Sequence, residues 1–152
     1  FSDWAVKGHA VMRELVGLVD EDTAAFDKIM AAFGLPKGTE EEKAARAQAI
    51  EKATLYATQV PLRTMKASFK AFEITRAMAE IGNPNSVSDA GVGALAARSA
   101  VLGAQLNVKI NAASLNDKAK AAELVAEADE IAAKAIREEK EILDIVNSKI
   151  NG

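Results

Sequence analysis

The sequence predicts an all-α protein, an antiparallel array or bundle of about five helices that forms one domain over residues 1–152. Hydrophobic residues make up 49% of the chain and aromatic residues only 5%, which suits close-packed helices better than a sheet. Apolar residues recur every three or four positions along extended segments, the spacing of one helical face. Short connectors that contain glycine or proline separate these segments, as is typical of antiparallel helices.

The first two helices have clear end signals. Residues 2–33 are expected to form one helix, whose apolar face comprises Trp4, Val11, Leu15, Leu18, Phe26, Ile29 and Phe33. Residues 34–38 end it, because glycine caps helices and proline does not continue them. Thr39 and Glu42 have the spacing of a capping box, so a second helix is expected from residue 39 to about residue 59, before Pro61 breaks or kinks the path.

The second half of the chain is expected to hold three further helices. The third spans about residues 61–81 and is followed by a turn rich in glycine, asparagine and proline. Ser88 has the character of an N-cap, and Asp89 suits the positive end of a helix dipole, so a fourth helix is expected from there to about residue 112. A fifth helix begins at Asn116 or Asp117 and ends near residue 150.

Composition limits the possible functions. The formal net charge is −3 and the basic residues are scattered, so no nucleic-acid partner is expected, because that needs a concentrated basic patch. The sequence has no apolar segment long enough to cross a membrane, and no signal peptide is visible at its start. With no cysteine and His9 as the one histidine, a cytoplasmic protein without a metal site or redox cofactor is expected.

Asp22 is the first candidate for chemistry. It continues the three- and four-residue steps of the first predicted helix between Leu18 and Ala25, a position that the pattern assigns to the buried face. A partly desolvated carboxyl group there would be tuned toward neutrality, and could then both accept and donate protons. The alternative is that the apolar stripe rotates slightly and leaves Asp22 at the solvated edge of the seam.

Asn107 and Asn111 are candidates for ligand binding. They lie one turn apart on one face of the fourth predicted helix, and Gly103 continues that face. A glycine inside a helix costs about 1 kcal/mol relative to alanine, which indicates a packing or access role. Two carboxamides beside a small residue can read the donors and acceptors of a flat heterocycle. Equally, they can form amide hydrogen bonds at a close crossing of two helices.

A series of short segments forms a recognisable pattern in its order and spacing. Residues 18–26 read LVDEDTAAF, and the further segments are Gly34-Leu35-Pro36-Lys37, Glu41-Glu42-Lys43 with Arg46, Val60-Pro61-Leu62, Gly82-Asn83, Ser88-Asp89 and residues 103–111. The pattern resembles the formiminotetrahydrofolate cyclodeaminase family, which also includes methenyltetrahydrofolate cyclohydrolases and has LVDxDxxAF as one of its segments. The family's glycine-rich PGGGS segment, which precedes its first helix, has no counterpart in residues 1–152. We therefore expect the natural protein to extend further toward the N-terminus.

The resemblance implies roles for particular residues in a helical protein that is at least dimeric. The second aspartate of the family's VDxD segment, implicated in cyclodeaminase chemistry, matches Asp22. Matches to positions of the site or its support are Ser88, Asp89, Asn107 and Asn111. Arg46 matches as well, and its guanidinium can hold a folate carboxylate or, alternatively, form an exposed ion pair.

The function implied by the resemblance is that of a formiminotetrahydrofolate cyclodeaminase, an ammonia lyase of one-carbon metabolism and histidine degradation. N10 of 5-formiminotetrahydrofolate would attack the formimino carbon, and Asp22 would move the proton that lets ammonia leave. The resemblance equally allows a methenyltetrahydrofolate cyclohydrolase, in which the same carboxylate activates water. The implied partners are the folate substrate, a second or further copies of the chain, and a fused or associated formiminotransferase.

A function of another class is a non-catalytic helical dimerisation domain. The last predicted helix has a near-heptad stripe made of Leu124, Ala128, Ile131, Ala135, Ile142 and Ile145. Such a stripe suits an interface between two helices of different chains. A domain of this kind would bind no folate.

Overall fold

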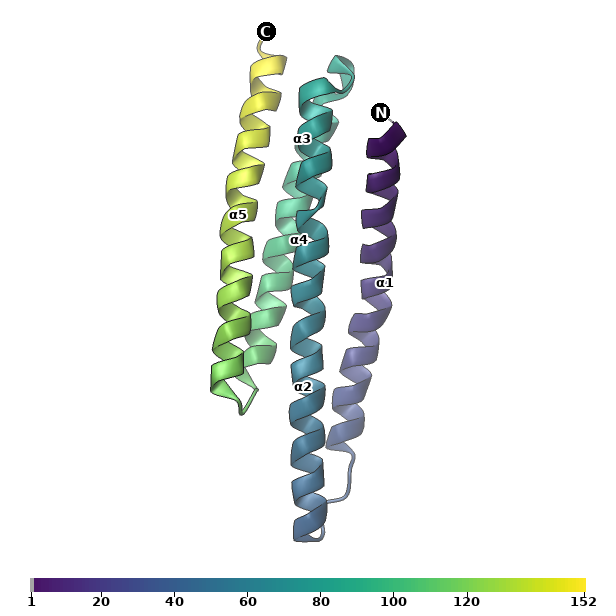
Figure 1. The fold of residues 1–152 in the computed structure, drawn as a ribbon, viewed down its shortest axis with the longest axis vertical. Helices are drawn as coiled ribbons and strands as arrows, with labels where there is room; N and C mark the ends of the chain where they lie inside the picture. The colour runs from purple at the N-terminus through teal and green to yellow at the C-terminus, as the bar shows by residue number, and fades with distance from the viewer. Residues whose placement is uncertain (1) are drawn as a thin grey trace.

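The structure, a computed structural model that describes residues 2–152, consists of helices joined by short connectors (Figure 1). In chain order they are α1 (Ser2–Phe33), α2 (Glu40–Phe69), α3 (Ala71–Ile81), the 3₁₀ helix η1 (Pro84–Ser86), α4 (Val87–Ala113) and α5 (Lys118–Ile150). Residues 2–152 contain no strand. The predicted all-α class is confirmed, as are the predicted bounds of the first helix and the end of the last.

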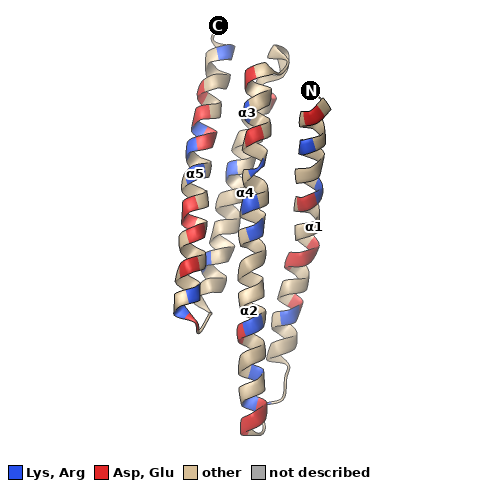
Figure 2. Cartoon of the chain, in the orientation of Figure 1, with Lys and Arg blue, Asp and Glu red and all other residues tan. Residues whose placement is uncertain are grey.

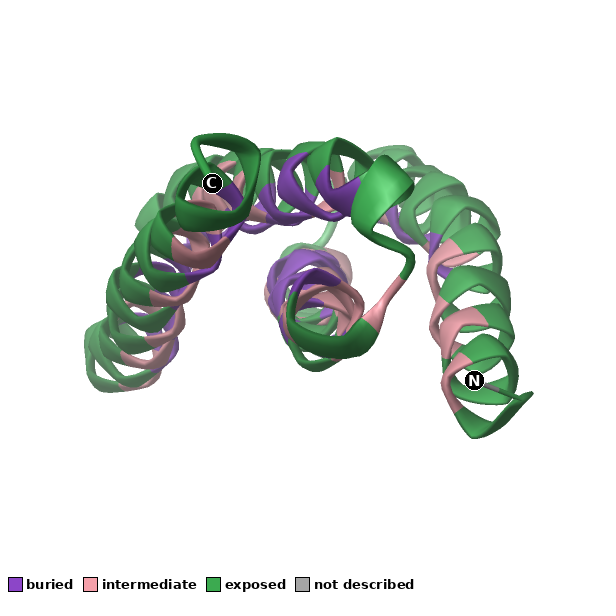
Figure 3. Cartoon of the chain, turned by 90° about the horizontal axis from the view of Figure 1, so that it is seen from above, coloured by how far each residue is buried: buried purple, intermediate pink, exposed green. Residues whose placement is uncertain are grey.

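The helices form an arch with one helix inside it (Figure 3). α2 and α3 follow one another along the middle of the molecule, between α1 and α5 (Figure 1). Seen from one end, α1, the α2–α3 segment and α5 make up the arch, and α4 lies in its hollow. α4 packs against α2, α3 and α5, while α1 packs against α2 and α3. One side of α4 therefore faces the open side of the arch.

Two apolar clusters hold the helices together. The larger joins α2, α3, α4 and α5, and its largest fully buried side chains are Met65, Phe72, Val101, Val108, Leu115 and Ile142. The smaller joins α1 to α2 through Leu18, Ala25, Ala57, Val60 and Ala67. Because burial of apolar area is the main stabilising term, α1 is attached less firmly than α5.

The apolar stripe of α5 belongs to the larger cluster. Leu124, Ala128, Ala135 and Ile142 are buried, and Ile131 and Ile145 pack against the cluster. The expectation that this stripe forms a dimer interface is therefore wrong, because its side chains are already used within the chain.

α2 continues through Pro61, where the sequence predicted a break or a kink. Proline has no N–H, so inside a helix it leaves the carbonyl four residues earlier without its usual donor. Here that carbonyl belongs to Ala57, and the Asn111 side chain of α4 donates to it at 2.8 Å. The helix ends instead at Phe69, and Lys70 separates it from α3. The helix predicted over residues 61–81 is thus divided between α2 and α3.

α4 begins two residues earlier than predicted, because η1 leads directly into it. Ser86 is the N-cap residue and makes no side-chain cap hydrogen bond, while Ser88 lies exposed in the first turn. The prediction that Ser88 is the N-cap is therefore wrong, although Asp89 does lie in the first turn. Gly82 ends α3, where any side chain would collide with the carbonyl oxygen of Met78.

The two other predicted helix starts are confirmed. Thr39 and Glu42 form a capping box, with the Thr39 Oγ1 accepting from the Glu42 N–H at 3.2 Å and the Glu42 carboxylate accepting from the Thr39 N–H at 3.1 Å. Asp117 caps α5 by accepting a hydrogen bond from the Lys120 N–H at 2.9 Å. Short polar side chains at these positions satisfy free amides at the helix start.

Charge is distributed unevenly over the helices (Figure 2). Charged residues recur along α1, α2 and α5, whereas α4 has only Asp89, Arg98 and Lys109. Within the part of the chain that the structure describes, none of the helices combines the length and the apolar character needed to cross a bilayer.

Candidate functional site

A hollow of about 360 Å³ lies where α1, α2 and α4 meet, and we call it the α1–α4 hollow. Its lining comes from three helices and consists of Leu15, Leu18, Val19, Asp22, Thr23, Pro61, Thr64, Ala100, Ala104 and Asn107. Most of this lining is apolar. Its polar groups are one carboxylate, one carboxamide and two hydroxyls, so a ligand held there would meet few but distinct polar partners.

Asp22 is exposed, which agrees with the second of the two alternatives, the solvated edge of the seam, and not with the buried face. The residues that α1 buries are Leu18, Ala25 and Ala32, which follow one another at seven-residue spacing. Because this stripe is narrow, the intermediate step at Asp22 falls outside it and faces the hollow instead. Within residues 2–152 its carboxylate has neither an ion-pair nor a hydrogen-bond partner, unlike the adjacent Glu21. An unpaired carboxylate is free to accept a proton from a ligand.

Asn107 reaches the same hollow from α4. The structure thus brings together Asp22 and Asn107, which are far apart in sequence. Gly103, one turn before Asn107, is exposed, and a Cβ atom there would have no neighbour within 4 Å. The glycines of α4 that lie against other helices are Gly91 and Gly93, and a Cβ atom at Gly93 would lie 2.8 Å from Cγ2 of Thr75 on α3.

Asn111 points its amide at the backbone of α2 rather than into the hollow. Its Nδ2 donates to the Ala57 carbonyl, and Asn111 is not among the residues that line the hollow. The sequence left two roles open for the asparagine pair, ligand binding and hydrogen bonding between helices. Asn107 lines a hollow, as the first role requires, and Asn111 forms a hydrogen bond between helices, as the second requires.

Ion pairs hold α1 against α2 and α3. Arg63 binds the Glu21 carboxylate with both terminal nitrogens, at 2.5 and 3.0 Å. The hydrogen bond from Arg63 lowers the pKa of Glu21 below its ordinary value. Two further pairs, Lys70–Glu14 at 2.8 Å and Lys7–Glu73 at 2.7 Å, lie along the same helix. Glu21 is therefore structural, whereas the next residue, Asp22, remains free.

The other predicted site residues lie elsewhere. Arg46 donates through Nε and one terminal nitrogen to the carbonyl of Phe33, at 3.3 and 3.1 Å, and so caps the end of α1. It lines a separate hollow with Lys37 and Lys43. Asp89 lines a hollow beside Gly82, at the opposite end of α4 from Asn107, and Ser88 is exposed nearby. Asn107 comes eighteen positions after Asp89 along the helix, a rise of about 27 Å.

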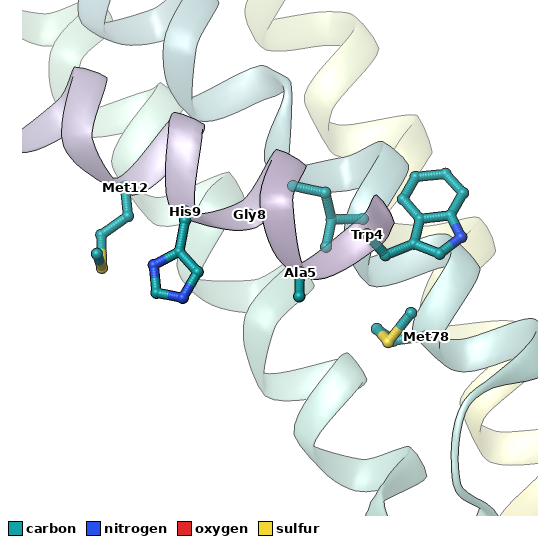
Figure 4. A pocket seen from close by; sticks show the side chains of 7 residues that line it. Trp4, Ala5, Gly8, His9, Met12 and Met78 are labelled. Carbon is teal, nitrogen blue, oxygen red and sulfur yellow. The ribbon is translucent and has the colours of Figure 1, made fainter. Parts of the chain in front are cut away.

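Another hollow, of about 450 Å³, lies between α1 and α3 (Figure 4). His9 and Met12 project from α1 into it, and Met78 reaches it from α3. Its lining has no carboxylate and no carboxamide, so its only group able to transfer protons is the His9 imidazole. In residues 2–152 no cluster of three or more potential metal ligands is found.

Two hydroxyls of the α1–α4 hollow escaped the sequence analysis. Thr23 donates to the Val19 carbonyl and Thr64 to the Val60 carbonyl, both at 3.2 Å. Because each hydroxyl hydrogen is already donated to a backbone carbonyl, each hydroxyl oxygen can accept a hydrogen bond from a ligand. The signal for Thr23 was its place next to Asp22. Thr64 comes one turn after Pro61, and its relevance follows only from the unbroken path of α2.

The arrangement can support proton transfer at a polar centre held against an apolar surface. Asp22 supplies a base, and the Asn107 amide can donate to an oxygen or nitrogen that develops negative charge. The apolar lining offers a surface for a flat ring system. No lysine or arginine lines the hollow, so positive charge on a bound molecule would meet only the Asp22 carboxylate.

Comparison with known proteins identifies the relatives of this chain. It is 41% identical over 145 residues to the methenyltetrahydrofolate cyclohydrolase of Methylorubrum extorquens, an alignment that covers 95% of this chain and 70% of that protein. It is 36% identical over 109 residues to the formimidoyltransferase-cyclodeaminase of Mus musculus, which covers 72% of this chain but only 20% of the much longer mouse protein.

The fold has a match among solved structures. The formiminotetrahydrofolate cyclodeaminase of Thermotoga maritima superimposes with a TM-score of 0.80 over 93% of this chain and 67% of that one, at 21% identity. The family model described as formiminotransferase-cyclodeaminase matches residues 1–130. These matches extend over most of the chain, and the chain belongs to the formiminotransferase-cyclodeaminase family.

Proposed function

We propose that this chain acts on the one-carbon unit of a tetrahydrofolate derivative, with the α1–α4 hollow as its active site. The observation that carries the proposal is that the free Asp22 carboxylate and the Asn107 amide line the same, largely apolar hollow. The substrate class is taken from the relatives, because the Methylorubrum and Thermotoga proteins are both named for reactions of a tetrahydrofolate derivative. The reaction needs only positioned proton transfer, so no cofactor is proposed.

The first candidate reaction is hydrolysis of 5,10-methenyltetrahydrofolate to 10-formyltetrahydrofolate. It is favoured by the relative at 41% identity, which is named for this reaction. Asp22 takes a proton from water as the water oxygen bonds to the methenyl carbon, which neutralises the cationic N5–C–N10 unit. The carbon–N5 bond then breaks, N5 receives the remaining hydroxyl proton, and the carbon keeps the oxygen as a formyl group on N10. One proton is released overall.

In the hydrolysis, Asn107 would orient the reacting centre. Its amide N–H can donate to the new oxygen while the tetrahedral intermediate forms, and its carbonyl can accept from an N–H of the substrate. The negative Asp22 carboxylate also suits a cationic substrate, because opposite charges attract strongly in a partly apolar site. Leu15, Leu18 and Val19 would support the ring system.

The second candidate reaction is the cyclodeaminase reaction predicted from the sequence. Its support is the eukaryotic relatives, which carry that activity in their names. N10 attacks the carbon of the protonated formimino group of 5-formiminotetrahydrofolate, and the proton lost by N10 passes through Asp22 to the nitrogen of that group. This nitrogen then carries three hydrogens and leaves as ammonia when its bond to the carbon breaks, which gives the cationic 5,10-methenyl product. Both reactions place a base next to N10 and the one-carbon unit, so one hollow can serve either.

The experiment is to give the full-length protein each substrate separately. Loss of methenyltetrahydrofolate absorbance faster than the spontaneous rate supports the cyclohydrolase. Appearance of that absorbance from 5-formiminotetrahydrofolate, with release of ammonia, supports the cyclodeaminase. If neither substrate reacts above the background rate in a folded protein, the folate proposal is wrong.

We also propose that the chain assembles at least as a homodimer, through the open face of α1. Apolar side chains on this face are between 50% and 65% exposed, at the three- and four-residue steps of a helix-pairing seam: Met12, Val16, Val19, Phe26, Met30 and Phe33. An exposed apolar surface of this length is typical of an interaction site. A formiminotransferase is a further proposed partner, because relatives such as the mouse protein are named for both activities.

A further inference from the structure

Pro61 creates a defect in α2 beside the α1–α4 hollow. The residue is buried within the helix and lines the hollow. Its ring nitrogen has no hydrogen, so the Ala57 carbonyl, one turn earlier, receives no backbone donor from position 61. Ala57 is itself buried between α1 and α2, where an unpaired carbonyl is costly.

The threonines around Pro61 do not repair this defect. Thr54 donates to the Ile50 carbonyl and Thr58 to the Thr54 carbonyl, each at 2.8 Å, and Thr64 donates to Val60. Among the side-chain hydrogen bonds of residues 2–152, the one that reaches the Ala57 carbonyl comes from Asn111, at 2.8 Å. A residue of α4 therefore completes the hydrogen-bond ladder of α2.

The position of this bond links it to the candidate site. Asn111 follows Asn107 by one turn of α4, and Ala57 precedes Pro61 by one turn of α2. Asn107 and Pro61 both line the hollow, so the bond joins the two helices one turn away from it. Asp22 lies on α1, which packs on α2 through Leu18 and Ala57. α2 is thus the common support of Asp22 and Asn107.

We propose that Asn111 is a positioning residue, a latch that fixes the register of α4 on α2 by completing the helix at Pro61, and so sets Asn107 opposite Asp22. The part of this inference that concerns turnover rests on the proposed function. The latch does not touch the substrate. A displacement of about 1 Å in a reacting group can lower the reaction rate by about 100-fold. A bond that sets the register of α4 on α2 should therefore have a measurable effect on turnover.

The test removes the Asn111 amide in two backgrounds of the full-length protein. Asn111→Ala is compared with the parent, and P61A/N111A is compared with Pro61→Ala. Alanine at position 61 restores a backbone N–H for the Ala57 carbonyl, so the amide becomes dispensable in that background. Asn107→Ala, made in the same two backgrounds, is the matched control, because it removes an amide one turn away that has no backbone partner.

Three readouts are compared between the backgrounds. In the native background we expect Asn111→Ala to lower the melting temperature by about 3–8 °C and kcat by about 10- to 100-fold. The side-chain amide resonance of Asn107 should also shift in the NMR spectrum. With Pro61→Ala already present, the same change should have little effect on any readout, while Asn107→Ala should cost the same turnover in both backgrounds. If Asn111→Ala does not fold, recovery of folding in P61A/N111A supports the latch.

Other results overturn the proposal in distinct ways. Equal losses of melting temperature in the two backgrounds, or failure of both variants to fold, show that Asn111 does not act through the gap at Pro61. Recovery of melting temperature without recovery of turnover shows that Asn111 contacts the substrate. If the parent protein turns over no folate, the proposed function fails, but the melting temperatures and the Asn107 resonance still decide the latch.

Discussion

The two outer helices of the arch, α1 and α5, are similar in length but are used differently. α5 buries seven residues against the rest of the chain, whereas α1 buries only Leu18, Ala25 and Ala32. Large apolar side chains remain exposed along most of α1, and on α5 only Ile136 and Ile150 do so. On one side of α1, where little apolar area is buried, ion pairs add attachment: Glu21 pairs with Arg63 of α2, and Glu14 pairs with Lys70 between α2 and α3.

This difference separates stability from chemistry within one small protein. α5 and the inner side of α4 form the core that holds the fold together. α1 supplies the Asp22 carboxylate and half of the lining of the α1–α4 hollow. A helix that is fully packed has no surface left for a ligand, so the loosely packed helix is the one that can carry the site. Changes in α1 should therefore affect turnover first, and changes in α5 should affect stability first.

The largest expected effect is on turnover, from the loss of the free carboxylate of α1. We expect Asp22→Asn to lower kcat by about 10²–10⁴-fold, because it removes the proposed base while keeping the side chain's shape. The melting temperature should change little, since Asp22 is exposed and unpaired within the described residues. Glu21→Gln is the matched control, an adjacent carboxylate bound to Arg63, and should keep most of the turnover. Equal losses in both variants would contradict the role of Asp22.

The next effect is on stability, from a change in the core of α5. Ile142→Ala should lower the free energy of unfolding by about 2–5 kcal/mol, because Ile142 is fully buried and truncation leaves a cavity. Ile136→Ala, on an exposed part of the same helix, should change it by no more than about 0.5 kcal/mol. Chemical denaturation measures both. Turnover per folded molecule should be unchanged in both variants, and a loss of turnover in Ile142→Ala alone would show that α5 also shapes the site.

The exposed face of α1 gives a test of assembly. The double variant F26E/M30E places charge in the proposed seam, so its dimer should dissociate at concentrations where the parent remains associated. Ile136→Glu introduces a single negative charge at an exposed apolar position of α5 and should leave the mass unchanged. Sedimentation velocity reads the mass of all three proteins. A parent that is monomeric at high concentration, or a dimer that is lost only in Ile136→Glu, would overturn the proposed interface.

The smallest effect concerns the attachment of α1 and depends on pH. The pKa of Glu21 is lowered in the folded protein by its hydrogen bond from Arg63. A group with a lowered folded pKa stabilises the fold above its ordinary pKa, and this contribution is lost as the pH falls through the lowered value. Arg63→Met should therefore flatten the decrease in melting temperature below about pH 5. An unchanged acid profile, or an unchanged Glu21 titration in the NMR spectrum, would show that the pair contributes nothing.

Most of the fold followed from local sequence signals. The capping box at Thr39, the N-cap at Asp117 and the apolar steps of the first and last helices are local features, so they were predicted correctly. Pro61 was misjudged because the group that repairs it, Asn111, is far away in sequence. Ser88 was misjudged because η1 carries the chain into α4 without a capping side chain.

The candidate site was predicted less completely, because it depends on which helices meet. The pattern singled out Asp22 and Asn107, but it left open whether Asp22 lies on the buried face or at its solvated edge. The three- and four-residue steps do not give the width of the buried stripe, which here has seven-residue spacing. Arg46, Ser88 and Asp89 match the family pattern, but they lie at other positions along the helices. Thr64 became visible only once α2 was seen to continue through Pro61.

The most direct measurement is a crystal structure of the full-length protein with 5-formyltetrahydrofolate, a stable analogue with its one-carbon unit on N5. We expect that unit to lie in the α1–α4 hollow, within hydrogen-bonding distance of the Asp22 carboxylate and the Asn107 amide. Binding in the hollow between α1 and α3, beside His9, would contradict Asp22 as the base and move the chemistry to the other end of α1.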